Sequence, residues 1–322
     1  MRILFATYPM AFHTPGGGEF QLLMYKKNLE QIGVSVDFFD MWNPQFKNYD
    51  LVHYFSCVAG AVPFCNFVKQ IKLPLVISSS LWITEASKYN YDISSISNQL
   101  NLADKILTNS NIESQNLSKV LSIPASKFST IYNGVDEHFS VKVPANLFRN
   151  KFSIHNHFFL NVANIEPRKN QLLLARAVKK FPNFKLVIIG HIRDNNYFDQ
   201  IIAENKEQVI YIPFIENDSE FLKSAHSAST LFIMPSFLET PSIAALEAFL
   251  LGSKIVITSE GSAEEYFKDK AFYVNPNSLE SIEEGIAKAI SSDTFVVDDI
   301  NIKFWSQISI ELKNLYNQVI IS

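Results

Sequence analysis

The sequence predicts an α/β protein made of two doubly wound, Rossmann-like domains. A chain of 322 residues, 47% of them apolar, is long for one domain and ample for two hydrophobic cores. Short β-type runs alternate with helical patterns along its whole length, in two successive sets. Such alternation indicates parallel sheets that are covered by helices on both faces.

The first set begins at the N-terminus, where an apolar run precedes a glycine-rich turn and an amphipathic segment. The predicted strands of this half are Ile3–Tyr8, Val34–Asp40, Leu51–Phe55, Leu75–Ser79, Lys105–Thr108 and Thr130–Tyr132. Its clearest predicted helices are Gln21–Gln31 and Asn111–Leu121. The first run resembles a weak signal peptide, but the glycine turn and helix that follow at once favour a β-strand.

The second set repeats this alternation. Its predicted strands are Phe158–Ile165, Lys185–Ile189, Val209–Ile212, Thr230–Met234, Lys254–Thr258 and Phe272–Val274. Its clearest predicted helices are Gln171–Lys180 and Leu279–Ser291. The periodicity breaks around Glu137–Lys151, and the sequence therefore predicts an N-terminal domain over 1–145 and a C-terminal domain over 146–303.

Charge and cysteine content exclude several classes of protein. The net charge is −4 and 19% of residues are charged, which does not favour binding to nucleic acid. The two cysteines, Cys57 and Cys65, form no disulfide framework, and we expect a reducing, cytoplasmic environment. Asn116-Leu-Ser118 and Asn217-Asp-Ser219 fit the glycosylation pattern, but nothing else in the sequence points to secretion.

The segment Glu239–Glu247 carries the strongest functional signal. It places two carboxylates eight residues apart around a predicted helix start, with Thr240 as N-cap and Pro241 in the first turn. The backbone N–H groups of Ser242, Ile243 and Ala244 would then form an anion site of the kind that binds phosphate. Carboxylates beside a phosphate suit neutral hydroxyls, such as those of a ribose and a hexose. A pair of surface glutamates is the alternative, but the position after a buried strand favours a nucleotide-sugar site.

Two further segments carry weaker signals. Glu166-Pro167-Arg168-Lys169-Asn170 follows a predicted strand, and its two cations suit a diphosphate, although an exposed basic turn is the alternative. Gly16-Gly17-Gly18 precedes a helix, where it is either a turn or a close backbone contact with a phosphate or sugar.

The order of these segments resembles that of the retaining family-4 glycosyltransferases of the GT-B fold, in which two Rossmann-like domains face each other across a cleft. The resemblance covers nearly the whole chain and is closest from Asp104 onward. The matching segments are Ile131–Asp136, Pro167–Asn170, Glu239–Glu247, Gly261–Glu265, and the pairs Phe304-Trp305 and Leu315-Tyr316 of a terminal helix. In this fold the terminal helix, here 304–322, packs back on the N-terminal domain.

The resemblance implies a role for each matching residue. Arg168 and Lys169 would hold the donor diphosphate and stabilise the departing nucleotide, Glu239 would bind the transferred sugar, and Glu247 the ribose. The backbone at Pro241, Ser242, Ile243 and Ala244 would complete the phosphate site, and Gly17 and Gly18 would approach the donor from the other domain. The catalytic residues implied are therefore Arg168, Lys169 and Glu239. Because the chain has no Asp-x-Asp motif, we expect no metal ion and no cofactor.

Two departures from the family pattern bear on the donor. Asn164 stands where the family commonly has an arginine, so that Arg168 would supply the charge with a different geometry. Many members carry a histidine after the fourth strand, where this chain reads Ser78-Ser-Ser-Leu-Trp82. His13, beside the glycine turn, is a candidate substitute.

The expected function is a retaining, metal-independent hexosyltransferase with a nucleotide-diphosphate sugar as donor, UDP-glucose first. We expect a glycan or lipid-carrier-linked acceptor in surface polysaccharide synthesis, a cytoplasmic location or the inner face of the membrane, and at most weak peripheral membrane association. The alternatives are a GT-B nucleotide-sugar epimerase and a non-catalytic nucleotide-sugar-binding protein.

Overall fold

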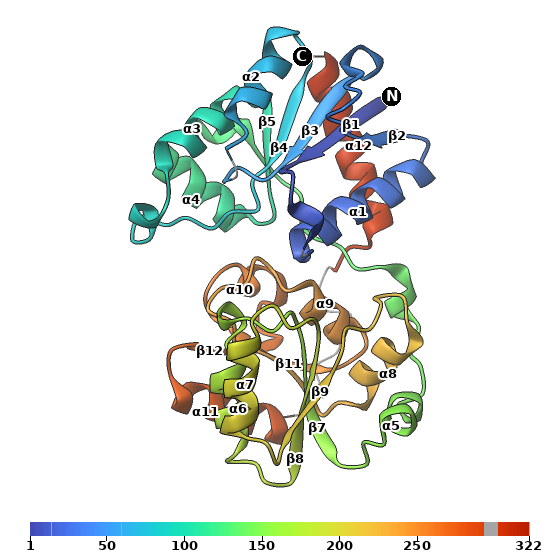
Figure 1. Ribbon diagram of the computed structural model, residues 1–322, viewed down its shortest axis with the longest axis vertical. Helices are drawn as coiled ribbons and strands as arrows, with labels where there is room; N and C mark the ends of the chain where they lie inside the picture. The colour runs from blue at the N-terminus through green and yellow to red at the C-terminus, as the bar shows by residue number, and fades with distance from the viewer. Residues whose placement is uncertain (14, 59, 293–301, 322) are drawn as a thin grey trace. The chain divides into compact units, whose positions relative to one another are not determined.

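The computed structural model describes the chain except for residues 14, 59, 293–301 and 322 (Figure 1). The chain divides into two compact units. The first comprises Met1–Gly134 and Lys303–Ser322, and the second comprises Val135–Ile302. Residues 293–301, just before the chain returns to the first unit, and residue 322, the end of the predicted terminal helix, lie outside the described residues.

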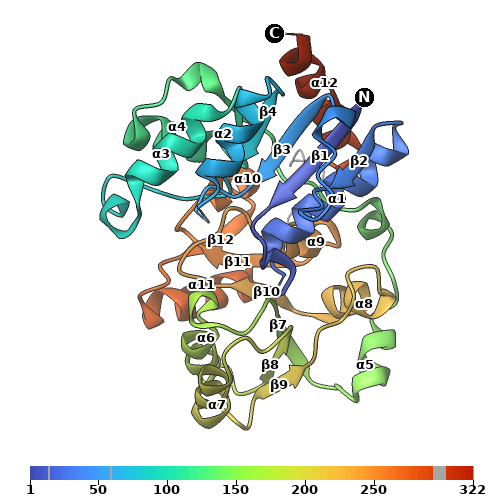
Figure 2. The same ribbon diagram turned by 45° about the horizontal axis from the view of Figure 1, so that its top comes forward.

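The first unit contains one parallel sheet in the order β2-β1-β3-β4-β5-β6. Its strands are β1 (Arg2–Thr7), β2 (Ser35–Phe38), β3 (Leu51–Phe55), β4 (Leu75–Ser78), β5 (Lys105–Thr108) and β6 (Phe128–Thr130). Its helices are α1 (Gly17–Gln31), α2 (Val62–Gln70), α3 (Ile93–Leu102), α4 (Asn111–Leu121) and α12 (Trp305–Ile321). Helices α2, α3 and α4 lie on one face of the sheet, and α1 and α12 lie side by side on the other (Figures 1 and 2).

Aromatic side chains fix α12 to the first sheet. Trp305 is fully buried, with its ring edge-on to Tyr25 of α1 at 5.9 Å between centroids. The hydroxyl of Tyr316 lies 2.6 Å from Nδ1 of His53 in β3, and the other ring nitrogen of His53 lies 2.8 Å from Ser78 Oγ. The C-terminal helix is therefore part of the core of the first unit.

The second unit contains a parallel sheet in the order β12-β11-β10-β7-β8-β9. Its strands are β7 (His157–Val162), β8 (Phe184–Ile189), β9 (Val209–Ile212), β10 (Leu231–Met234), β11 (Lys254–Thr258) and β12 (Ala271–Val274). Its helices are α5 (Asn146–Phe152), α6 (Gln171–Val178), α7 (Asn195–Glu204), α8 (Glu220–Ala228), α9 (Ile243–Leu250), α10 (Ala263–Phe267) and α11 (Leu279–Ser291). Helices α6, α7 and α11 cover one face, and α5, α8 and α9 the other (Figures 1 and 2).

The strand order of the second sheet locates the edge at which a ligand is expected to bind. Starting from β7, the chain moves outward to β8 and β9, then returns to pair β10 with β7 and continues in the opposite direction. The order therefore reverses between β7 and β10. In open α/β sheets, ligands bind outside the carboxyl ends of the strands at such a reversal.

Each of the twelve predicted strands has a counterpart in the structure, with shifts of up to a few residues at the ends. Two other predictions need correction. The chain divides between Gly134 and Val135, so that the predicted boundary at residue 145 lies inside the second unit. The reason is packing: Ser224 Oγ of α8 donates to Pro144 O at 2.7 Å, and Phe148 N donates to Ser224 Oγ at 2.9 Å.

The second correction concerns the start of α9. Thr240 is not its N-cap and Pro241 is not in its first turn, because α9 begins at Ile243 with Ser242 as N-cap. Ser242 Oγ accepts a hydrogen bond from Ala245 N at 3.2 Å. Just before, Glu239 pairs with Gly261 as an isolated parallel β-bridge, and the helix begins two residues later than the predicted first helical residue, Pro241.

Among the described residues, no helix combines the length and apolar character needed to cross a membrane.

The packing of α11 on the sheet yields a test of the core. A Cβ on Gly285 would lie 2.4 Å from Val274 Cγ1 in β12 and 3.4 Å from Val256 Cγ1 in β11. Overpacking of this kind costs about 1–3 kcal/mol, against about 1 kcal/mol gained from helix propensity. We expect Gly285→Ala to lower the free energy of unfolding by about 1 kcal/mol in urea denaturation. Val274→Ala removes the methyl group that the new Cβ would contact. In the double variant Gly285→Ala/Val274→Ala, the loss of unfolding free energy should therefore be smaller than the sum of the losses in the two single variants, and an equal sum would contradict this packing.

Candidate functional site

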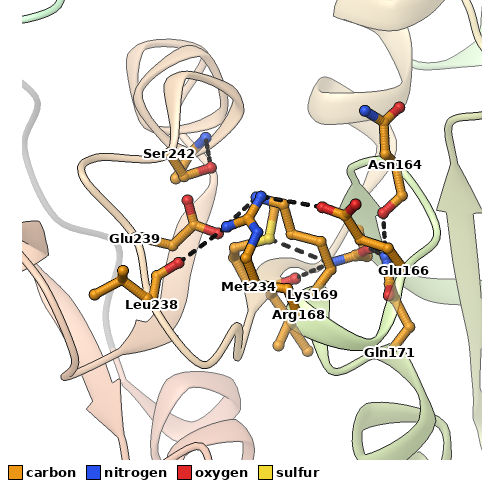
Figure 3. Close-up of polar contacts among 12 residues, drawn as sticks. Asn164, Glu166, Arg168, Lys169, Gln171, Met234, Leu238, Glu239 and Ser242 are labelled. Atoms are coloured by element: carbon orange, nitrogen blue, oxygen red, sulfur yellow. Dashed lines mark hydrogen bonds and ion pairs between the residues drawn. The ribbon is translucent and has the colours of Figure 1, made fainter. Parts of the chain in front are cut away.

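The predicted site residues of the second unit gather where the strand order reverses. Arg168 and Lys169 lie in the loop after β7, within a short 3-10 turn (Pro167–Lys169), and Glu239 lies in the loop after β10. The backbones of the two loops are joined, because Phe237 N donates to Arg168 O at 3.0 Å. Figure 3 shows both cations directed toward the segment that carries Leu238 and Glu239.

Lys169 and Glu239 form a largely buried ion pair. The distance from Lys169 Nζ to Glu239 Oε1 is 2.7 Å, and the side chains are 13% and 5% exposed. Removing one partner of such a pair leaves an uncompensated charge in a poorly solvated place, which is strongly destabilising. Each side chain therefore fixes the other at the carboxyl edge of the sheet.

The backbone of Glu239 is fixed by the turn after β11. Glu239 N donates to Glu260 O at 3.1 Å, and Ser262 N donates to Glu239 O at 2.9 Å. Gly261, between them, has φ +111°, and a Cβ there would lie 2.0 Å from Glu239 O. Only glycine fits, so the Gly261–Glu265 segment found in the sequence serves to hold Glu239 in place.

Arg168 belongs to a charged group that the sequence only partly predicted. Its Nη2 donates to Glu166 Oε1 at 3.1 Å and its Nη1 to Leu238 O at 3.3 Å, while 51% of the side chain stays exposed. Glu166 Oε2 also accepts from Arg193 Nη1 at 3.0 Å. Arg193, in the loop after β8, was not predicted. Its position just after a predicted strand at the same edge of the sheet is the signal that could have identified it.

Asn170 connects three loops at this edge. Its side-chain amide donates to Pro235 O at 3.0 Å and to Pro276 O at 2.8 Å, while its backbone has φ +58°. Next to it, Gln171 Nε2 donates to the main-chain oxygen of Asn164 at 3.0 Å (Figure 3). Position 164 is thereby held beside the cationic turn through its backbone.

The start of α9 offers backbone donors to the same region. Ser242 caps the helix, because its side chain accepts from Ala245 N, and its main-chain oxygen accepts from Ala245 N at 3.1 Å and Leu246 N at 3.2 Å. The N–H groups of Ile243 and Ala244 donate to none of the groups in the part of the chain that the structure describes. Two donors at the positive end of a helix dipole, near Arg168 and Lys169, suit an anion. Pro241 and Ser242 precede the helix and are buried.

Glu247 lies one turn further along α9 and is 2% exposed. Asn217 Nδ2, from the loop after β9, donates to Glu247 Oε1 at 2.7 Å. Burial, and to a smaller extent the nearby Asp136 carboxylate, raise the pKa of Glu247 to about 8. Sequence reasoning identified Glu247 but not Asn217, which it noted only as part of a glycosylation pattern.

Gly17 and Gly18 lie in the first unit, as the first two residues of α1. A Cβ on either would meet open space, so packing within this unit does not require glycine there. Glu19 caps the helix by accepting from Gly16 N at 2.8 Å. The predicted role of Gly17 and Gly18 toward a donor stays a prediction.

The raised pKa of Glu247 predicts how stability depends on pH. Between the ordinary pKa of 4.5 and the folded value of about 8, the folded protein holds a proton that the unfolded chain has released. Stability therefore falls as pH rises through this window, by up to about 1.4 kcal/mol per pH unit from this group. Glu247→Gln keeps an acceptor for Asn217 but lacks this proton. In urea denaturation between pH 4.5 and 8, the free energy of unfolding of the variant should rise relative to that of the wild type as pH rises. If the free energies of the two proteins changed with pH in parallel, the assignment would be contradicted.

Comparisons with known proteins agree with this architecture. The family model described as "Glycosyltransferase Family 4" matches residues 15–139, and the model described as "Glycosyl transferases group 1" matches residues 145–298. An uncharacterised glycosyltransferase of Methanocaldococcus jannaschii is 26% identical over 234 residues, covering 66% of this chain and 59% of the relative. The O-antigen chain mannosyltransferase B of Escherichia coli is 22% identical over 219 residues, covering 65% of this chain and 57% of the relative. The chain thus spans less than two thirds of the length of both relatives.

Among solved structures, the Anabaena protein HepE in complex with UDP and glucose has a TM-score of 0.80 at 18% identity, covering 98% of this chain and 99% of that one. Likeness at this identity concerns the fold. The two family models cover nearly all of the chain, one for each half, and each half folds as a doubly wound unit. The chain therefore belongs to the family-4, group 1 glycosyltransferases, with the GT-B fold.

Proposed function

We propose that the protein transfers a hexose from a nucleotide-diphosphate sugar to a glycan or carrier-linked acceptor, with retention of the anomeric configuration. The observation that carries this proposal is the arrangement of the Lys169–Glu239 ion pair, the half-exposed Arg168 and the start of α9 at one sheet edge. Cations and backbone donors suit a diphosphate, and carboxylates suit sugar hydroxyls.

In this proposal, the diphosphate lies between Arg168, Lys169 and the N–H groups of Ile243 and Ala244. Negative charge develops on the diphosphate as the bond from the anomeric carbon to its oxygen breaks. Fixed positive groups stabilise that charge more in the transition state than in the ground state, which accelerates the reaction. Glu239, on the other side of Lys169, binds hydroxyls of the transferred hexose, and Glu247 binds those of the ribose.

Retention follows when the acceptor attacks from the face that the diphosphate leaves. The acceptor oxygen forms its bond to the anomeric carbon there, and its proton passes to an oxygen of the departing diphosphate. The donor itself then acts as the base. This accords with a sequence in which no dedicated base was identified.

UDP-glucose remains our first candidate donor, and a solved structure of the same fold contains UDP and glucose. A mannose-carrying nucleotide is the second candidate, because an Escherichia coli relative is named as an O-antigen chain mannosyltransferase. The same name supports an acceptor in surface polysaccharide synthesis.

The experiment that tests the proposal combines the purified chain with UDP-glucose or GDP-mannose and a panel of saccharide and carrier-linked acceptors. Acceptor-dependent release of nucleoside diphosphate, in the presence of a chelator, is the expected result, and NMR of the product should show the anomeric configuration of the donor. Donor binding without turnover would indicate a non-catalytic binding protein. A change of the donor sugar without an acceptor would indicate an epimerase.

Kinetics of Arg168 variants test the leaving-group role. Arg168→Ala and Arg168→Lys should lower kcat more than they weaken donor binding, because the charge that the guanidinium stabilises appears in the transition state. We expect Arg168→Ala to lose roughly 100-fold or more in kcat, with Arg168→Lys between it and the wild type. Lys179→Ala, at an exposed surface position just after α6, is the control. Normal turnover of Arg168→Ala would show that the turn is only a basic surface feature.

A further inference from the structure

A set of polar contacts runs behind Glu247 and is not explained by the ligand contacts proposed above. It comprises Asp136 and His138, at the start of the second unit, and Asn217, in the loop between β9 and α8. His138 lies in a 3-10 turn (Glu137–Ser140) that packs against α9. Three segments that are distant in sequence therefore meet at one buried carboxyl group.

His138 holds the main chain of residue 217. Its Nε2 lies 3.1 Å from Asn217 O, and because a carbonyl oxygen can only accept, Nε2 is the donor. Its Nδ1 lies 2.9 Å from Asp136 Oδ1, and its own carbonyl oxygen accepts from Lys223 Nζ at 3.2 Å. The imidazole is thus fixed on both sides, and the loop is fixed at the residue that it contacts.

Asn217 then holds one oxygen of Glu247. Its Nδ2 donates to Oε1 at 2.7 Å, and Oε2 has no hydrogen-bond partner in the part of the chain that the structure describes. An oxygen to which no protein group donates can accept a hydrogen bond from a ligand hydroxyl. The orientation of the side chain, set by Asn217, determines where such a hydroxyl must lie.

We propose that Asn217, held by His138, is a positioning residue that orients Glu247 toward the ribose hydroxyls of the nucleotide. This inference rests on the proposed function of the site. A glutamate side chain has several rotatable bonds, and fixing it before the ligand arrives lowers the entropy cost of binding. The loop after β9 therefore contributes to ribose recognition without a contact to the ribose.

The test is the discrimination between a nucleotide and its 2′-deoxy analogue. Calorimetry measures the dissociation constants of UDP and 2′-deoxy-UDP, and of GDP and 2′-deoxy-GDP, for each variant. Loss of a ligand hydroxyl that pairs with the carboxyl group of Glu247 costs about 10- to 100-fold in affinity, so the wild type should prefer the ribose form by that factor. Glu247→Ala should bring the ratio of the dissociation constants, 2′-deoxy form over ribose form, close to one, while the diphosphate still binds.

The positioning variants should lower the same ratio. We expect Asn217→Ala and Asn217→Leu, which both lack the donor, to reduce it at least fivefold, and His138→Ala to reduce it to a smaller extent. His138→Gln can still donate to Asn217 O and should recover most of the loss. Asp218→Ala, an exposed neighbour in the same loop, is the matched control and should keep the wild-type ratio. Circular dichroism melting curves identify any variant that fails to fold, and the two Asn217 variants provide independent readings.

The outcomes separate the inference from the function on which it rests. If Glu247→Ala abolishes the discrimination but both Asn217 variants keep it, the positioning role is wrong and the ribose role stands. If Glu247→Ala keeps the discrimination, Glu247 does not bind ribose and the inference falls with that role. If none of the four nucleotides binds the wild type, the proposed function is itself wrong.

Discussion

The ion pair between Lys169 and Glu239 is the interaction on which the arrangement of the site depends. It joins the loop after β7 to the loop after β10, which are neighbours only because the strand order reverses between these two strands. Neither side chain could stay so poorly solvated alone. The sheet topology brings the two loops together, and the charges of the two residues select one arrangement of them.

This pairing also bears on how an anion would enter. In the free protein, the charge of Lys169 is balanced by Glu239, while the half-exposed Arg168 shares Glu166 with Arg193. A diphosphate would approach a group of three cations and two carboxylates rather than an isolated lysine. The carboxylates keep the cations in place and limit the field that they present to an approaching anion.

Much of the fold could be predicted from the sequence, because strand–helix alternation is a local pattern. The strands from β1 to β12 all match predicted runs, and the GT-B fold is confirmed. The start of α9 was wrong because the bridge from Glu239 to Gly261 overrides the local signal of Thr240 and Pro241. The division of the chain was misplaced because the turn after Gly134 is held by α8, which lies far along the sequence.

The candidate site shows the same division between local and distant information. Arg168, Lys169, Glu239 and Glu247 occur in short segments with recognisable spacing. Arg193 and Asn217 occur in no such segment, and only the folded chain shows that they reach Glu166 and Glu247. A pattern within one segment identifies candidate residues of that segment, whereas contacts between distant segments are known only from the folded chain.

The amide of Asn170 has a consequence for the dynamics of this edge of the sheet. It donates to carbonyl groups 65 and 106 residues away in sequence, and so joins the loops after β7, β10 and β12 through one side chain. Loops linked in this way cannot open one at a time without leaving a buried amide or carbonyl unpaired. Their backbone amides should then exchange with solvent as one cooperative group, although each loop alone has the irregular structure that usually opens independently.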